Sequence, residues 1–395
     1  MRHIIHMIAS TIVVEPEDFE HIRSQVREFI RNEVVPREQE IADGDAIPAD
    51  IRQKAAAMGL FGYAIPTEYG GLGLNITQDV QLALEFGYTS LSFRSMFGTN
   101  NGIAGQVLVG FGTEQQKARW LEPIASGAVV ASFALTEPEA GSDPSGLTTR
   151  AVRDGDDWLI SGNKRFITNA SEADLFVVFA RTRAADDNGT GIAVFLVPAE
   201  SKGVSVGPKD KKMGQEGGST AEVAFDNVRV NNDAVVSGEV DTGFRAAMSV
   251  LARGRVHIAA LAIGQAERAL EESVSYAATN RQGGRPIGDN QLVQAMLAEQ
   301  KTLCMAGRAL AIEAAALYLS GEDRRLGPSA AKLFCTESAG RVADLAVQIH
   351  GGTGYMRGVP VERIYRDIRL LRLYEGTSEI QKLIIGRHLL RNVAS

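Results

Sequence analysis

The chain has 395 residues, of which 45% are hydrophobic and 23% are charged, and its formal net charge is -7. These values are typical of a folded globular protein and exclude a disordered or fibrous chain. No basic cluster suggests a nucleic-acid partner, and apolar runs such as 191–198 are too short to span a membrane. Two cysteines and the absence of a targeting pattern in residues 1–10 predict a cytoplasmic protein. His3 and His6 have ligand-like spacing but no second ligand cluster, so no metal site is expected.

The first part of the chain has the periodicity of helices. Apolar residues recur every three or four positions between Phe19 and Ile30, after Pro16, and Pro36 is expected to end or bend this helix. Further helices are predicted around 48–58, 76–88 and 113–125, and the glycine-rich segment 69–73 is expected to be a loop.

The pattern changes near residue 130 to short β-rich runs. Asp154-Gly155 predicts a hairpin turn, and strands are expected at 174–181 and 191–197, separated by a polar loop. Residues 223–230 nearly alternate, with a bulge or turn at Asp226-Asn227. Because no helices intervene, these strands predict a β-sandwich or small barrel. The helical period returns from about residue 242 and persists to the end.

Three polar motifs interrupt this pattern. In 131–143, hydroxyls and exposed amides have the chemistry to bind a polar ring or a phosphate, although a purely structural loop is an equal alternative. The segment 164–169 is typical of a strand edge. Glu375, if buried, would have a raised pKa and serve as a general base, whereas a solvated glutamate at a helix start is the alternative. Residues 352–357 lack the third glycine of a dinucleotide-binding motif.

Together these motifs resemble the acyl-CoA dehydrogenase family over residues 16 to 391. The resemblance is carried by Ala134-Leu135-Thr136-Glu137-Pro138 with Gly141-Ser142-Asp143, and by 348–354 followed by Tyr374-Glu375-Gly376-Thr377. It implies an α+β fold in which a terminal segment (1–14) precedes an N-terminal helical domain (15–128), a central β-sandwich or barrel-like domain (129–238) and a C-terminal four-helix-bundle domain (239–395). The implied activity is FAD-dependent α,β-dehydrogenation of an acyl-CoA thioester to the 2-enoyl-CoA.

The resemblance also implies roles for individual residues. Glu375 would take the α-proton, and N5 of the flavin would accept the β-hydride. The residues that match FAD contacts are Phe133, Leu135, Thr136, Ser142, Phe166, Ile167, Thr168, Gln291, Thr377 and Glu379. Gln348, Gly351 and Gly352 match a segment that reaches FAD from a neighbouring subunit, which implies at least a dimer and, as in most of the family, a homotetramer. An electron-transferring flavoprotein is the expected electron acceptor.

The sequence departs from the family pattern at two places, and a third position decides which carboxylate is the base. Phe166 replaces the usual Trp. Asn280 and Gly283 stand where the family has the Arg and Phe of a pyrophosphate-binding motif, and Arg281 is the candidate substitute, although helical geometry would turn it by about 100°. Gly254 occupies the position from which other branches supply the base, so Glu375 is the remaining carboxylate.

Substrate contacts are implied for Ser142, Arg255 and Gly376, with Arg255 near the CoA portion. Arg94-Ser95 aligns with a pair that binds the distal carboxylate in glutaryl-CoA dehydrogenases, while an arginine paired with a helix carboxylate is the alternative.

Two rival functions remain open at this point. One is an oxygen-using enzyme resembling acyl-CoA oxidase or nitroalkane oxidase, and the other is a non-catalytic FAD- or CoA-binding assembly protein.

Overall fold

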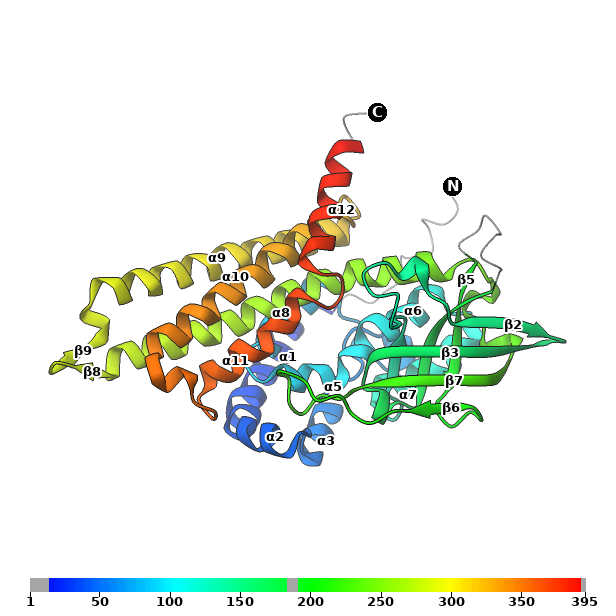
Figure 1. The fold of residues 1–395 in the computed structure, drawn as a ribbon, viewed down its shortest axis with the longest axis horizontal. Helices are drawn as coiled ribbons and strands as arrows, with labels where there is room; N and C mark the ends of the chain where they lie inside the picture. The colour runs from blue at the N-terminus through cyan, green and yellow to red at the C-terminus, as the bar shows by residue number, and fades with distance from the viewer. Residues whose placement is uncertain (1–13, 183–190, 392–395) are drawn as a thin grey trace.

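The structure is a computed structural model that describes residues 14–182 and 191–391. His3, His6 and all of the predicted terminal segment except Val14 lie outside these ranges, as does most of the polar loop expected before residue 191. The chain runs through a block of helices, a curled sheet and a second block of long helices (Figure 1). This is the α+β fold that the resemblance implies.

The N-terminal block contains seven α-helices among the described residues. They are α1 Pro16–Phe29, α2 Glu38–Gly44, α3 Ala49–Ala57, α4 Ile76–Phe86, α5 Leu91–Asn101, α6 Ile103–Phe111 and α7 Glu114–Ser126. The predicted helices correspond to α1, α3, α4 and α7. Between α1 and α2 the chain passes through a π-helical turn and a 3-10 turn that contains Pro36, so this proline bends the helical path.

Helices α5 and α6 were not predicted from the sequence. Every residue of α5 is buried, so the helix has no polar face and shows no amphipathic period. One side of α5 contributes to an aromatic cluster, in which Phe97 lies 5.1 Å from Phe86 and 5.3 Å from Phe93 between ring centroids. These contacts hold α5 rigidly and leave its other side to line a cavity.

The central block is a sheet that has seven strands within the described parts of the chain. Its strands are β1 Ala131–Ala134, β2 Arg150–Asp154, β3 Asp157–Thr168, β4 Leu175–Arg181, β5 Ile192–Pro198, β6 Val204–Val206 and β7 Thr220–Asn231. Their order is β1-β4-β2-β3-β7-β6, and β5 pairs with β4. The predicted hairpin joins β2 to β3, with Gly155 at φ 62°, and the predicted bulge lies at Asn227, with φ 48°. Both are positions at which the chain takes the left-handed conformation.

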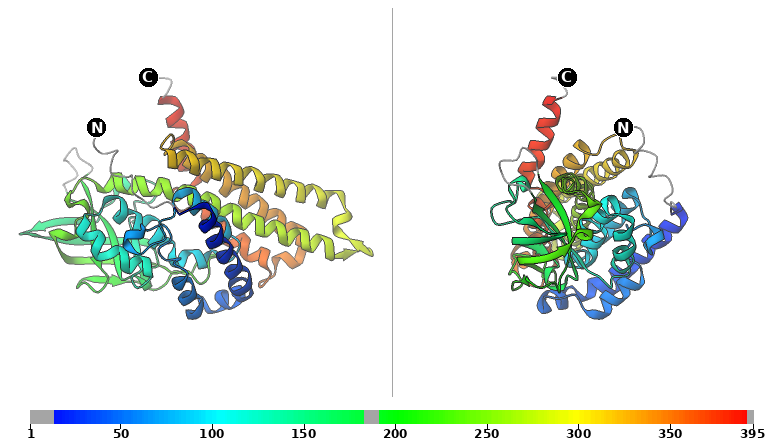
Figure 2. Two further views of the ribbon diagram at one scale, coloured as in Figure 1. Left: turned by 180° about the vertical axis from the view of Figure 1, so that it is seen from behind. Right: turned by 90° about the vertical axis from the view of Figure 1, so that its right-hand side faces the viewer.

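The C-terminal block is a bundle of long helices. It contains α8 Gly243–Thr279, α9 Gln291–Ser320, α10 Leu326–His350, α11 Pro360–Arg369 and α12 Ser378–Arg391, with a short hairpin of β8 Arg281–Gln282 and β9 Arg285–Pro286 at its tip. The helices α8, α9 and α10 lie side by side, and α12 projects from the bundle (Figure 2). Helix α10 ends at His350 and is followed by Gly351, whose φ of 57° suits a glycine.

Two of these helices, α8 and α9, are long and apolar enough to cross a membrane by length and composition alone. The expectation that all apolar segments are too short was therefore wrong for these two. In α8, 72% of the most apolar window is buried inside the protein, so α8 is a core helix of the bundle. In α9 only 28% of that window is buried, and its outer face is exposed.

Candidate active site

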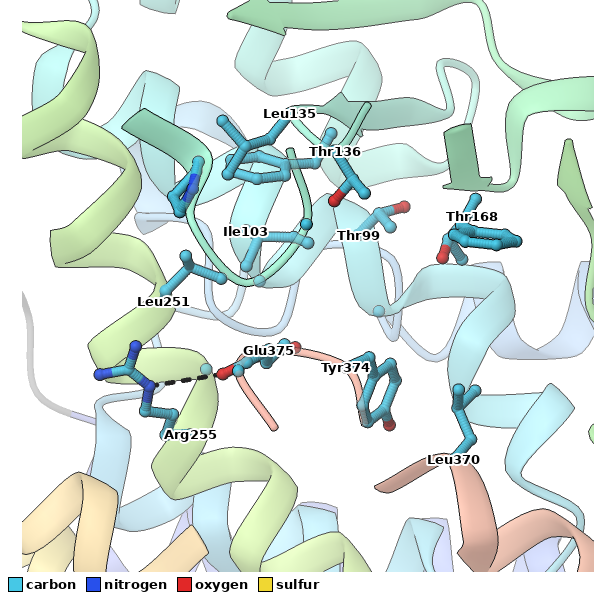
Figure 3. Close-up of a pocket in the computed structure, with 18 of the residues that line it drawn as sticks. Thr99, Ile103, Leu135, Thr136, Thr168, Leu251, Arg255, Leu370, Tyr374 and Glu375 are labelled. Atoms are coloured by element: carbon cyan, nitrogen blue, oxygen red, sulfur yellow. Dashed lines mark hydrogen bonds between the residues drawn. The ribbon is translucent and has the colours of Figure 1, made fainter. Parts of the chain in front are cut away.

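A cavity of about 540 Å³ lies where the three blocks meet, between α5, α8, the ends of β1 and β3, and the turn before α12 (Figure 3). This volume is in the range of small-molecule and cofactor sites. Eleven of the residues singled out from the sequence line it: Arg94, Phe133, Leu135, Thr136, Ser142, Phe166, Ile167, Thr168, Arg255, Glu375 and Gly376. Tertiary structure thus brings together residues that lie up to 282 positions apart in the chain.

Glu375 lies in a tight turn between α11 and α12. Its φ of 53° is in the left-handed region, which is unfavourable for a glutamate, and the following Gly376 has φ 93°. The next residue begins a helix cap, because the Thr377 hydroxyl accepts a hydrogen bond from the backbone N–H of Ile380 at 3.3 Å. The strained turn directs the Glu375 side chain toward the cavity, on the opposite side from Leu135 (Figure 3).

The Glu375 carboxylate is poorly solvated. Its Oε2 atom is buried and has no hydrogen-bond partner among the described residues. Burial raises the pKa of Glu375, and the positive charges of Arg94, Lys332 and Arg255 only partly oppose this rise. On α8, a Cβ at Gly254 would lie 2.0 Å from Oε2, so the carboxylate occupies the space that this glycine leaves open. A carboxylate in this state has the properties of a general base.

The opposite wall of the cavity is built from β1, β3 and the loop between β1 and β2. Phe166 sits at a bulge in β3 with φ 57°, and the residue is 59% exposed. Thr136, Ser142 and Thr168, which carry hydroxyl groups, line the same cavity. An accessible aromatic side chain in a cavity that also offers hydroxyl groups fits a flat heteroaromatic ring with polar edges, such as the isoalloxazine of FAD.

A buried ion pair supports this wall from behind. Lys164 donates to Glu137 at 2.7 Å and to the carbonyl oxygen of Leu135 at 3.1 Å. Glu137 also accepts the backbone N–H groups of Thr148 and Thr149. The charge of Lys164 holds the pKa of Glu137 well below its ordinary range. In the 131–143 motif, Glu137 therefore anchors the loop while Leu135 lines the cavity.

A second polar chain ends at Arg94 on α5. The Nε of Arg94 donates to Nε2 of His257 at 2.8 Å, which requires the proton of His257 to lie on Nδ1. That Nδ1 lies 2.7 Å from Oδ1 of Asp79, and Arg253 contacts the other oxygen of Asp79 at 2.8 Å. Burial lowers the pKa of His257, in keeping with a neutral ring. Arg94 is thus held by a histidine and not by the helix carboxylate that the sequence left open as an alternative.

Seven of the residues singled out from the sequence do not line this cavity. Five lie at or toward the tip of the bundle: Arg281, Gln291, Gln348, Gly351 and Gly352. The other two flank the start of α12: Thr377 and Glu379. Arg281 is in the β8–β9 hairpin and donates to the carbonyl of Gly284 at 3.1 Å. Because α8 ends at Thr279, Arg281 is not in a helix, and the expected helical rotation of about 100° does not occur.

Several residues at the site were missed by sequence reasoning: Tyr63, Asp79, Lys212, Gln215, Arg253, His257, Lys332 and Gln381. One available signal was the run of three basic residues within 253–257, in an otherwise apolar stretch of helix. Asp79 and Lys332 carry no comparable local signal. Among residues 14–182 and 191–391, no group of three or more His, Cys, Asp or Glu side chains has the arrangement of a metal site.

Comparison with known proteins gives concordant results. Three family models match: "Acyl-CoA dehydrogenase, N-terminal domain" at 16–128, the middle domain at 132–228 and the C-terminal domain at 241–390. The chain is 39% identical over 369 residues to an acyl-CoA dehydrogenase of Bacillus subtilis, covering 93% of this chain and 97% of that protein. It is 38% identical over 372 residues to the caffeyl-CoA reductase-Etf complex subunit CarC of Acetobacterium woodii, covering 94% and 97%. A glutaryl-CoA dehydrogenase of Mycobacterium smegmatis in complex with FADH2 superimposes with a TM-score of 0.88 at 30% identity, covering 95% of each chain.

Proposed function

The chain belongs to the acyl-CoA dehydrogenase family, and we propose that Glu375 is the base that removes the α-proton of its acyl-CoA substrate. The enzyme catalyses FAD-dependent dehydrogenation of an acyl-CoA thioester. The observation that carries the proposal for Glu375 is its buried, unpartnered Oε2 atom inside the cavity. This oxygen is free to accept a proton, and its raised pKa makes it a stronger base than a solvated carboxylate.

The residues of the β-domain wall would hold the cofactor, with Phe166 against the ring and the hydroxyls of Thr136, Ser142 and Thr168 toward its polar groups. When bound, FAD supplies the hydride acceptor for the reaction. Leu135 and Ile167 are almost fully buried and exclude water from the inner end of this wall. The protein thereby places the base on one side of the cavity and the cofactor-binding wall on the other (Figure 3).

The turn that carries Glu375 also offers a backbone donor. The N–H of Glu375 has no acceptor among the hydrogen bonds of the described residues. We propose that it donates to the thioester oxygen and so stabilises the charge that develops when the α-proton leaves. Arg255, whose Nε lies 3.4 Å from the carbonyl oxygen of Glu375, remains our candidate for a contact with the CoA portion.

The decisive experiment is anaerobic reduction of the purified flavoprotein by acyl-CoA substrates. Wild-type protein should show flavin absorption that bleaches with substrate. Glu375→Gln should keep the flavin spectrum but lose bleaching by about 10³-fold or more, because the base is missing while the cofactor wall is intact. Turnover of Glu375→Gln near the wild-type value would reject the assignment. Colourless protein that cannot be reconstituted would favour the non-catalytic alternative.

For the substrate, we propose an acyl group that ends in a carboxylate or another hydrogen-bond acceptor. Arg94 is 9% exposed and lines the cavity, and no hydrogen bond joins its two terminal nitrogens to another described residue. A guanidinium whose two terminal nitrogens keep their N–H donors free is suited to a carboxylate. The similarity to a glutaryl-CoA dehydrogenase supports the same class of substrate.

The same bleaching assay tests this substrate class when butyryl-CoA is compared with glutaryl-CoA. Arg94→Ala should slow reduction by glutaryl-CoA about 10- to 100-fold more than reduction by butyryl-CoA, because only the former would lose a charged contact. Arg94→Lys is the matched control, since it keeps the charge but loses the planar fork. Equal effects of Arg94→Ala on both substrates would dismiss the proposal.

We also propose that the enzyme is a homotetramer, or at least a dimer, in which the bundle tip of one subunit completes the cofactor site of another. The tip lies about 36 Å along α8 from Arg255, at 1.5 Å per residue, so Gln348, Gly351 and Gly352 lie far from the cavity of their own chain. Exposed apolar residues on α9 and α12 support further contacts: Leu292, Met305, Ile312, Leu319, Leu383, Leu389 and Leu390. A monomer in sedimentation that retains FAD would contradict this assembly.

The proposed electron acceptor is an electron-transferring flavoprotein, which is supported by the similarity to a subunit of a reductase-Etf complex. Reduction of such a flavoprotein without oxygen consumption is the expected result, whereas rapid oxygen consumption would favour the oxidase alternative.

A cytoplasmic location remains part of the proposal. It is supported by two buried, unpaired cysteines, Cys304 and Cys335, and is testable by cell fractionation.

A further inference from the structure

We propose that Lys332 is a positioning residue for Glu375, and that its ammonium group holds the turn at Gly376 so that the carboxylate stays directed into the cavity. This inference rests on the proposed role of Glu375 as the base. It assigns a function to a buried lysine that belongs neither to the cofactor-binding wall nor to the Arg94 chain.

Lys332 lies within α10, and its side chain is completely buried. Its Nζ donates to the carbonyl oxygen of Gly376 at 2.7 Å, which is the only hydrogen bond of this ammonium among the described residues. No carboxylate in the described parts of the chain lies within 4.0 Å of Nζ. A buried lysine without a paired carboxylate is rare and costly, so its contact with the catalytic turn calls for a function.

The carbonyls of the turn are held from two sides. Gln381 on α12 donates to the carbonyl oxygen of Gly376 at 2.9 Å and lies 3.4 Å from that of Glu375. Lys332 and Gln381 therefore share one acceptor, and both side chains are fully buried. Because the turn contains two consecutive residues with positive φ, it needs such contacts to resist relaxation into a more favourable conformation.

A neighbouring contact shows that α10 acts as a platform for the turn. Glu337, one and a half turns further along the helix, accepts a hydrogen bond from the Ser378 hydroxyl at 2.5 Å and one from Arg372 at 2.9 Å. Lys332 and Glu337 thus tie α10 to residues before, within and after the turn. Of these contacts, only that of Lys332 reaches Gly376, the residue that follows Glu375.

Lys332 also contributes charge near the base. Four charged groups act on Glu375: Arg94 from α5, Arg255 from α8 and Lys332 from α10 lower its pKa, and Asp79 from α4 raises it. Lys332 itself is influenced by Glu375, Arg255, Glu337 and Glu379, and burial lowers its pKa to about 8. The ammonium is therefore charged at neutral and acidic pH, where it favours the ionised form of Glu375.

The test compares two variants of Lys332 with a control on the same helix. Lys332→Met removes both the donor and the charge at nearly constant volume, and Lys332→Gln keeps an N–H donor without the charge. The control is Thr336→Val, because the buried Thr336 hydroxyl donates only to the carbonyl oxygen of Lys332 within α10, at 2.8 Å. This control disturbs α10 without touching the turn.

We expect Lys332→Met to lower kcat by about 10- to 100-fold while KM changes less than about threefold, because the base is misplaced but substrate contacts persist. The acidic limb of its pH–rate profile should move about one unit to higher pH, since loss of the cation raises the pKa of Glu375. Lys332→Gln should show the same pH shift with a smaller loss of kcat. Thr336→Val should change neither quantity.

A second readout isolates the base from the redox step. An acyl-CoA in which sulfur replaces the β-carbon has no β-hydride to lose, so exchange of its α-protons with D2O reports on Glu375 alone. Lys332→Met should slow this exchange, and the acidic limb of the exchange rate should move to higher pH as in the pH–rate profile. If Lys332→Met does not fold, the pH shift is measured with Lys332→Gln. Unchanged kcat and an unmoved acidic limb in a folded Lys332 variant would overturn the inference. Exchange at the wild-type rate in Glu375→Gln would instead overturn the proposed function.

Discussion

Replacing Gly254 with alanine separates the chemistry of the site from the stability of the fold. An ideal Cβ at this position would lie 2.0 Å from Oε2 and 3.0 Å from Cδ of Glu375. Since carbon and oxygen atoms approach to about 3.3 Å, the carboxylate would retreat by more than about 1 Å. A misplacement of this size costs on the order of 100-fold in rate, or about 2.7 kcal/mol in the barrier.

The expected effect on stability has the opposite sign. Gly254 is inside α8, where alanine is favoured over glycine by about 1 kcal/mol, and the displaced group is the end of a flexible side chain. Gly254→Ala should therefore lose about 100-fold in kcat while its resistance to urea stays equal or increases. The assay pairs kcat at saturating acyl-CoA with urea unfolding of the FAD-loaded protein.

Two other glycines provide matched controls. On the same helix, a Cβ at Gly264 would lie 2.2 Å from the backbone oxygen of Leu84 on α4, so Gly264→Ala should destabilise the protein by about 1–3 kcal/mol through helix separation. On α10, a Cβ at Gly340 would meet nothing closer than 3.6 Å, so Gly340→Ala should change neither activity nor FAD content. Near-wild-type turnover of Gly254→Ala would refute the reasoning, as would parallel losses of activity and stability.

Two further predictions concern buried carboxyl groups. Lys164→Met should destabilise the protein by about 3 kcal/mol near neutral pH, because Glu137 keeps its buried charge without its partner. Lys164 lowers the folded-state pKa of Glu137 to about 2, so its stabilisation is present above its unfolded pKa and is lost as pH falls through the folded value. The wild type and variant should therefore converge in urea unfolding toward pH 2. Asp367 is buried, accepts the backbone N–H of Gln215, and has its pKa raised to about 6 by burial. A carboxyl group with a raised folded-state pKa costs stability as pH rises through the folded value. Asp367→Asn should therefore be more stable than wild type by up to about 3 kcal/mol at pH 8 and should equal it below pH 4. Equal urea midpoints at pH 8 would contradict this prediction.

Secondary structure was predictable wherever its cause is local. The apolar repeat in α1, the capped start of α7 and the glycine turn between β2 and β3 each depend on a few neighbouring residues. Helix α5 escaped prediction because it is buried on all sides, so its residues show no contrast between faces. Its burial depends on the aromatic cluster that forms only when α4 and α5 meet.

The candidate site likewise contains residues that local sequence patterns identify and residues that only tertiary packing brings together. Glu375 and the 131–143 motif were identified because their local patterns match a family. Asp79 and His257 are 178 positions apart, and Lys332 and Gly376 are 44 positions apart, so no local pattern joins them. These contacts are set by how α4 and α10 pack against their neighbours.

The order of residues thus specified the reaction class, the order of the helical and β-rich blocks, and the carboxylate that acts as the proposed base, since all three are encoded in short stretches of chain. Packing alone decided that this carboxylate is desolvated, that Gly254 makes room for it and that Lys332 holds its turn. The physical reason is that burial and electrostatic environment arise from distant segments brought together, and these determine the pKa and the orientation of a side chain.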